Sequence, residues 1–217
     1  MNKKIKCILV LLSLGFCQTV FAKSELSKNV LLSRNIFRKV PFSSQYSEDG
    51  SLIRSIDFRS VNDLIPQLEE QFKVKLDGKK LEDRNESHIT VITPPEGKTG
   101  FFPGNIGIDK ALPTMEMIHI YKEIIQDTSF EVKCVGMQMN STNIVFYLVV
   151  ETKDIIDIRK EISDIVTARD STIPFSPTRE YYPHITIGYV GGDVFVDEDG
   201  KKVSKGEDTC VAGITYN

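Results

Sequence analysis

The stretch HITIGYV, residues 184–190, begins with the same tripeptide as the stretch HITVITP, residues 88–94. The chain has only three histidines, and two of them stand in this repeated tripeptide. Both stretches are rich in isoleucine, valine and threonine, which are typical of β-strands. We therefore predict strands over residues 87–93 and 182–190, in different halves of the chain.

Side chains alternate between the two faces of a strand, so residues i and i+2 share a face. His88 and Thr90 then lie on one face of the first strand, and His184 and Thr186 lie on one face of the second. The aliphatic residues between them occupy the opposite faces and are suited to a hydrophobic core. If the two strands lie around a pseudo-two-fold axis, the two histidine faces converge on one cleft.

Two imidazoles and two hydroxyls in one cleft suit the chemistry of phosphate esters. An unperturbed histidine has a pKa of about 6.5, so near neutral pH one ring can be neutral and the other protonated. The neutral ring would remove a proton from the attacking water or hydroxyl, and the protonated ring would donate one to the leaving oxygen. We expect His88 and His184 to be catalytic without a metal or cofactor. Either histidine can be the base.

The threonines of the two tripeptides have a different expected role. The hydroxyls of Thr90 and Thr186 can donate hydrogen bonds to the non-bridging oxygens of the phosphate. Tyr182 has the same strand parity as His184 and is a further candidate for substrate binding, because its ring could stack on a base. An ordinary strand aromatic explains Tyr182 equally well. Tyr189 shares its parity with the isoleucines of the motif and is expected in the core.

The remaining pattern predicts an α+β fold. Strands in adjacent pairs separated by helices favour this class over a doubly wound parallel sheet. The predicted helix over residues 154–166 is the clearest, because its isoleucines recur at spacings of three and four. The other predicted helices cover residues 60–72, where Ser60 is a candidate N-cap, and 112–127, and the other strands cover 130–139 and 143–150. His119 is expected on the solvated face of the second of these helices.

The first 22 residues have the pattern of a signal peptide. Three lysines precede a short apolar run, and Val20 and Ala22 stand at the positions that a signal peptidase recognises. We expect an exported protein, periplasmic or secreted, with an irregular N-terminal arm over residues 23–50 and one domain over residues 51–217. A chain of 217 residues is long enough for one domain with a real core.

Charge restricts the expected partners. Removing residues 1–22 takes the net charge from −3 to −6, because this segment contains three lysines and no acidic residue. An acidic chain argues against a surface that coats nucleic acid broadly. A small phosphodiester or an RNA end remains compatible as substrate. We expect a monomer that has no contact with the membrane after cleavage.

Two of the four cysteines, Cys7 and Cys17, belong to the predicted signal peptide. Cys134 and Cys210 remain. In an oxidising compartment such a pair can form a disulfide, and the alternative is two separate buried thiols.

Metal binding is not expected. Asp193, Asp197 and Asp199 follow the second motif, but they do not fit the ligand spacing of a calcium loop. A polar hairpin over residues 197–203 explains them better. No cysteine or histidine pair has the spacing of a zinc site.

Three segments resemble one family, the 2H phosphoesterases, which are named for two His-x-Thr or His-x-Ser motifs on a two-lobed α+β fold. They are SHITVITPPE (residues 87–96), YYPHITIGYV (residues 181–190) and DEDGKKVSKGEDTC (residues 197–210). Within that family they are most similar to the Swiss-Army-Knife branch, whose 2H domain is RNA-repair-like. The resemblance covers about residues 50–217.

The resemblance implies two lobes with pseudo-two-fold related antiparallel sheets flanked by helices. It also implies metal-independent hydrolysis of a phosphodiester, such as a 2′,3′-cyclic nucleotide or an RNA end. His88, Thr90, His184 and Thr186 match the family motifs directly. Two alternatives to a hydrolase remain open. A secreted binding module would hold phosphate or nucleotide without turnover, and an interaction protein would not respond to loss of either histidine.

Overall fold

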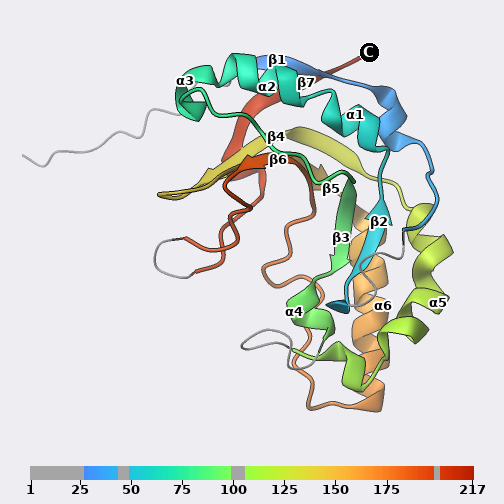
Figure 1. Ribbon diagram of the computed structural model, residues 1–217. Helices are drawn as coiled ribbons and strands as arrows, with labels where there is room; N and C mark the ends of the chain where they lie inside the picture. Colours follow the sequence, from blue (N-terminus) through green and yellow to red (C-terminus); the bar gives the residue numbers. More distant parts are fainter. Residues whose placement is uncertain (1–26, 44–48, 99–105, 198–200) are drawn as a thin grey trace, which may run out of the picture.

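Two β-sheets organise the molecule (Figure 1). The computed structural model describes residues 27–43, 49–98, 106–197 and 201–217. The larger sheet has the strand order β1-β7-β4-β5-β6, and the smaller sheet pairs β2 with β3. Neighbouring strands are antiparallel except for β1 and β7, which are parallel. The strands are β1 (Ser27–Leu32), β2 (Leu52–Ser55), β3 (His88–Ile92), β4 (Glu131–Met139), β5 (Ile144–Glu151), β6 (His184–Val190) and β7 (Cys210–Tyr216).

Helices flank both sheets, and this confirms the α+β prediction. In Figure 1, α5 and α6 lie beside the β2–β3 pair, and α1 and α2 lie beside β1 at the other end of the molecule. The helices are α1 (Phe58–Asn62), α2 (Ile65–Gln71), α3 (Lys73–Leu76), α4 (Pro94–Gly97), α5 (Thr114–Gln126) and α6 (Lys153–Arg169), with short 3-10 helices at Arg34–Phe37, Ile108–Lys110 and Glu207–Thr209.

Strand β5 is buried on both faces, which explains its nearly continuous apolar sequence. Phe146, Leu148 and Val150 point into the main core between the sheet and the helices. The alternate residues form a second cluster on the opposite face. This second cluster consists of Cys134, Val145, Tyr147, Val149 and Val194, with Tyr189, Val203 and Cys210 packed against it.

The N-terminal segment is more regular than its sequence predicted. Residues 27–32 form the edge strand β1, and residues 34–37 form a 3-10 helix. Val30 and Leu32 are fully buried, whereas Leu31 between them is 46% exposed. The prediction of an irregular arm is therefore wrong for these residues. The alternation of buried and exposed residues in β1 is too short to be recognised from the sequence. Its partner strand β7 lies at the other end of the chain, so no neighbouring strand in the sequence indicates the pairing.

The predicted helix over residues 60–72 is divided into α1 and α2. Ser60 is not the N-cap. The carboxylate of Asp57 accepts hydrogen bonds from the backbone N–H of Ser60 at 3.1 Å and from its hydroxyl at 2.6 Å, so Asp57 caps α1. Pro66 stands in the first turn of α2, the position in a helix that tolerates proline.

Cys134 and Cys210 form a disulfide, with their Cα atoms 5.8 Å apart. It links β4 to β7, which are neighbours in the large sheet. Residues 1–22, with Cys7 and Cys17, and also Asp199, lie outside the described residues. None of the described helices combines the length and the apolar character that crossing a membrane requires.

Candidate active site

The two motif strands, β3 and β6, contact each other although they belong to different sheets. The expected alternation is present in both. Ile89 and Ile185 are fully buried, whereas the histidine and threonine on either side of each are only partly buried. In β6, His184 pairs with Val149 and Thr186 with Tyr147, so both face the second cluster.

Hydrogen bonds join the two motif segments. Glu82, which precedes β3, exchanges two backbone hydrogen bonds with Tyr189 of β6, at 2.8 and 3.0 Å. The hydroxyl of Tyr181 donates to the carbonyl oxygen of Thr90 at 2.7 Å. These contacts place the strand of His88 beside the strand of His184.

A buried arginine supports this junction from behind. Arg159 of α6 is fully buried and donates to the carbonyl oxygen of Val91 in β3. It also donates to both carboxylate oxygens of Glu96, at 2.8 and 3.1 Å, and its guanidinium stacks 3.9 Å from the centre of the Tyr181 ring. Burial works to raise the pKa of Glu96, but the hydrogen bonds and charge of Arg159 lower it. The ion pair therefore anchors α6 to the motif junction.

His88 is oriented by an acidic residue on its own segment. Its Nδ1 atom lies 2.6 Å from a carboxylate oxygen of Glu86, and the His88 side chain is 11% exposed. A carboxylate at Nδ1 holds the proton on that nitrogen and fixes the ring orientation. The sequence analysis did not select Glu86, although its position two residues before His88 is a signal that could have found it.

His184 has a different environment. Its Nδ1 donates a hydrogen bond to the carbonyl oxygen of Tyr182 at 2.7 Å, and its Nε2 lies 3.2 Å from the Nζ atom of Lys205. Burial lowers the pKa of His184 well below 6.5, and the positive charges of Lys205, His88 and Arg84 lower it further. His184 is therefore neutral at physiological pH, with its proton on Nδ1.

Lys205 and Asp193 form a buried ion pair beside His184. Nζ of Lys205 donates to one carboxylate oxygen of Asp193 at 2.8 Å, and Arg84 donates to the other at 3.0 Å. The side chains of Lys205 and Asp193 are 5% and 3% exposed. Sequence reasoning missed Lys205 and Arg84. Lys205 lies in the segment over residues 197–210 that carries part of the family resemblance, but neither residue belongs to a His-x-Thr motif, and only the fold brings them to His184. Within the described residues, no group of three or more histidine, cysteine or acidic side chains could hold a metal ion.

Tyr182 and Tyr189 lie on either side of the second His-x-Thr motif, and only the predicted place of Tyr189 is wrong. Tyr182 contributes its carbonyl to His184, and its half-buried ring lies beside Gly206, where an added methyl group would be 3.9 Å from the ring. Tyr189 is half-buried against the second cluster and not in the main core. The pairing of β5 with β6 shifts register between Phe146 and Tyr147, and this irregularity turns Tyr189 to the other face.

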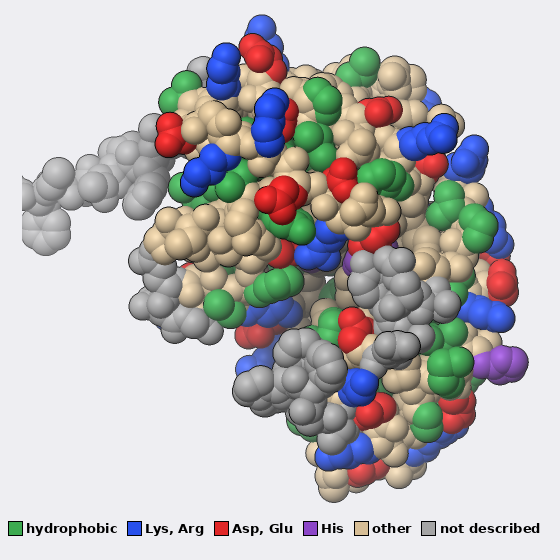
Figure 2. All heavy atoms as spheres, viewed as in Figure 1, with side chains coloured by type: hydrophobic (Ala, Val, Ile, Leu, Met, Phe, Trp, Pro, Cys, Tyr) green, Lys and Arg blue, Asp and Glu red, His purple; other side chains and the backbone are tan. Residues whose placement is uncertain are grey.

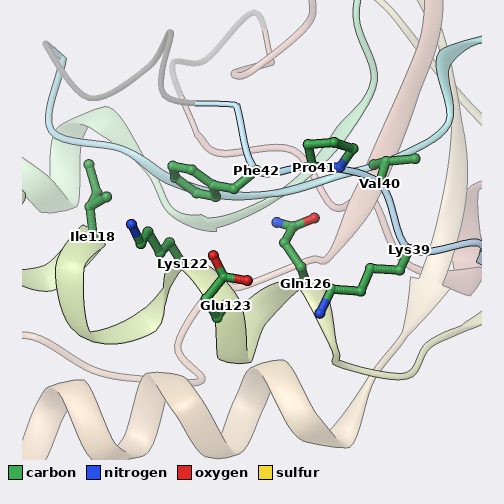
Figure 3. A pocket seen from close by; sticks show the side chains of 8 residues that line it. All are labelled: Lys39, Val40, Pro41, Phe42, Ile118, Lys122, Glu123 and Gln126. Atoms are coloured by element: carbon green, nitrogen blue, oxygen red, sulfur yellow. The ribbon is translucent and has the colours of Figure 1, made fainter.

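The surface over this region is hollowed. Figure 2 shows basic, acidic and histidine side chains gathered in the hollow at the centre of the face in view. A separate pocket of about 680 Å³ lies between residues 39–42 and α5 (Figure 3). It contains neither motif histidine. Its lining residues are Lys39, Val40, Pro41, Phe42, Ile118, Lys122, Glu123 and Gln126. The chemistry of the side chains, and not the size of a pocket, identifies the candidate site.

Comparisons with known proteins identify the family of the chain. The family model described as Swiss Army Knife, 2H phosphoesterase domain, matches residues 55–195, a range that includes both motifs and ends before Lys205. An RNA 2′,3′-cyclic phosphodiesterase from Methanocaldococcus jannaschii is 30% identical over 152 residues, which cover 69% of this chain and 75% of that relative. No solved structure matches the chain.

Proposed function

The chain belongs to the 2H phosphoesterases and is a phosphodiesterase hydrolase, and we propose that it opens a 2′,3′-cyclic phosphate on a nucleotide or an RNA end by metal-independent acid–base catalysis. One observation carries the assignment of roles. The two motif histidines have opposite partners at the described atoms, a carboxylate beside His88 and an ammonium beside His184. Two groups with opposing environments are suited to act as acid and base in one reaction.

His184 is the base in this proposal. Its lowered pKa keeps the ring neutral, and its Nδ1–H is held by the carbonyl of Tyr182. The lone pair on Nε2 is then the proton acceptor. It removes a proton from the attacking water while the new bond from the water oxygen to phosphorus forms.

His88 is the acid. The carboxylate of Glu86 provides the counter-charge that an imidazolium requires. His88 donates a proton to the ribose oxygen as its bond to phosphorus breaks, which leaves a phosphomonoester and a free hydroxyl. Thr90 and Thr186 lie beside the histidines on their strands and donate hydrogen bonds to the non-bridging oxygens. We retain Tyr182 as a candidate contact for the base of the nucleotide.

The cyclic substrate is supported by the printed activity of the Methanocaldococcus jannaschii relative, which is an RNA 2′,3′-cyclic phosphodiesterase. We also propose that the protein is exported, as its first 22 residues predict. The disulfide between Cys134 and Cys210 supports this, because disulfides persist in oxidising compartments such as the periplasm and the exterior of the cell.

A substrate panel tests the proposal. The purified protein is incubated in EDTA with the four nucleoside 2′,3′-cyclic phosphates, with adenosine 3′,5′-cyclic phosphate and with a linear dinucleotide, and the products are separated by chromatography. We expect turnover of the 2′,3′-cyclic phosphates to a single monophosphate isomer. Preference for the 3′,5′-cyclic or linear diester would overturn the substrate assignment. Saturable binding without turnover of any compound would favour the binding module.

A further inference from the structure

Lys205 occupies an unusual position for a lysine. Its side chain is buried, and its Nζ atom lies 2.8 Å from Asp193 and 3.2 Å from Nε2 of His184. The same nitrogen lies 5.3 Å from the centres of the rings of Tyr147 and Phe195. Two aromatic faces, one carboxylate and one imidazole therefore surround this ammonium group, and each of them stabilises a cation.

The contact with His184 has only one possible direction. Because Nδ1 donates its proton to the carbonyl of Tyr182, Nε2 of the neutral ring is an acceptor. An ammonium has no acceptor, so Lys205 donates to Nε2. The lone pair that would accept the proton from water is then already occupied by Lys205. The base becomes available only when this hydrogen bond opens.

An anionic phosphate in the cleft would offer Lys205 a better acceptor than a neutral imidazole, since hydrogen bonds between charged groups are stronger. We propose that Lys205 is a phosphate-binding residue that covers Nε2 of His184 while the site is empty and moves to the non-bridging oxygens when substrate binds. This inference rests on the proposed function. It adds a phosphate-binding cation that lies outside both motifs and beyond residue 195, where the match to the family model ends.

The neighbouring charges are consistent with such a role. Burial lowers the pKa of Lys205, Asp193 works to raise it, and the positive charges of Arg84 and Lys202 lower it. Three basic groups, Lys205, His88 and Arg84, act on His184. Two carboxylates lie among them, because Asp193 accepts from Lys205 and Arg84 and Glu86 lies beside His88. A phosphate would therefore meet cations that already have carboxylate partners, and it would compete with Asp193 and Nε2 of His184 for the ammonium of Lys205.

The principal test uses Lys205→Met, which keeps much of the aliphatic side chain and removes the ammonium. Lys202→Met is the matched control. Lys202 is three residues away, is exposed, and donates to the carbonyl oxygen of Glu180. The Lys202→Met variant therefore removes an equal charge from the same segment at a residue that does not contact His184. In Lys205→Met, the buried carboxylate of Asp193 loses one of its two cationic partners and keeps Arg84. A Lys205→Met/Asp193→Asn double variant is therefore prepared in case the single variant does not fold.

Phosphate affinity is measured first, with inorganic phosphate as the probe and histidine NMR signals as the readout. The chain has three histidines, and exposed His119 serves as the internal reference. We expect the dissociation constant for phosphate to rise roughly 10- to 100-fold in Lys205→Met, as expected for a lost charged hydrogen bond, and to stay near the wild-type value in Lys202→Met. Equal phosphate affinity in the wild type and a folded Lys205 variant would overturn the inference.

The same spectra follow the titration of His184. Without the ammonium of Lys205, the pKa of His184 should move upward relative to His119, because one source of positive charge is gone. An unchanged titration would contradict the contact with Nε2. If the wild type binds phosphate through Lys205 but hydrolyses no cyclic phosphate, the proposed function fails and the inference stands. If Lys205→Met hydrolyses cyclic phosphates with wild-type kcat/KM, the inference fails and the proposed function stands.

Discussion

The hydroxyl of Tyr181 donates a hydrogen bond to the carbonyl oxygen of Thr90 at 2.7 Å. Thr90 is the threonine of one motif, and Tyr181 lies three residues before the histidine of the other. This bond connects segments that are 91 residues apart in sequence. Since β3 and β6 belong to different sheets, this bond is one of the contacts that hold the two motif strands together.

Tyr181→Phe should weaken this junction. The substitution removes the hydroxyl that donates to the carbonyl oxygen of Thr90. Loss of one partner of such a hydrogen bond lowers the free energy of unfolding by about 1–3 kcal/mol. We also expect a lower kcat with cyclic substrate, because the acid and base would be held less firmly. Urea unfolding and steady-state kinetics measure both quantities.

Tyr216→Phe is the control for this prediction. The hydroxyl of Tyr216 makes only a long contact of 3.5 Å to the carbonyl of Val132, away from the motif strands. The two variants should therefore differ. Equal stability and equal kcat in both would show that the bond between Tyr181 and Thr90 does not organise the site.

Loss of Arg159 should be more severe. Arg159→Met leaves the carboxylate of Glu96 without its bidentate partner in a largely buried position, and breaking such a pair costs about 3–5 kcal/mol. Arg169→Met is the matched control on the same helix, because its ion pair with Glu116 is solvent-exposed and exposed pairs contribute little to stability. Similar losses in the two variants, measured by chemical unfolding, would contradict the anchoring role of Arg159.

The pH dependence of kcat/KM should reflect the lowered pKa of His184. A base must be neutral to accept a proton, and the folded protein binds that proton only at a pH well below 6.5. Activity should therefore persist as the pH falls through 6.5 and decline only as it approaches the lower pKa of the folded state. Initial rates across the acid range measure this profile. An acidic limb centred at or above 6.5 would contradict the assignment of His184 as the base.

Reduction of the disulfide between Cys134 and Cys210 should destabilise the fold by about 2–5 kcal/mol. The bond fixes the start of β7, and neighbouring Thr209 accepts a hydrogen bond from Tyr147, whose ring lies against His184. Thermal unfolding with and without dithiothreitol measures the effect. The Cys134→Ser/Cys210→Ser variant, which has no such bond to reduce, should show no response to the reductant. A wild-type melting temperature that does not respond to reduction would contradict a stabilising role.

The sequence predicted the two motif strands and the faces of the histidine, isoleucine and threonine at the start of each, because an alternation of polar and aliphatic residues is a local signal. It could not predict the environment of the histidines. Lys205 lies in a loop and contacts His184, and Arg159 lies in α6 and contacts Val91 of β3. Both contacts join residues far apart in the sequence, so they depend on tertiary structure. The place of Tyr189 was predicted wrongly for a similar reason, since the register shift opposite β5 interrupts the alternation.

Three single alanine variants provide the most direct test of two-histidine catalysis: His88→Ala, His184→Ala and, as the control, His119→Ala. His119 is exposed on α5 and away from both motifs, so its loss should leave kcat unchanged. General acid and base catalysis each contribute about 10²–10⁴-fold. With a nucleoside 2′,3′-cyclic phosphate in EDTA, we predict that kcat falls by at least about 100-fold in each motif variant while His119→Ala keeps the wild-type value. Wild-type turnover in folded His88→Ala or His184→Ala would contradict the mechanism.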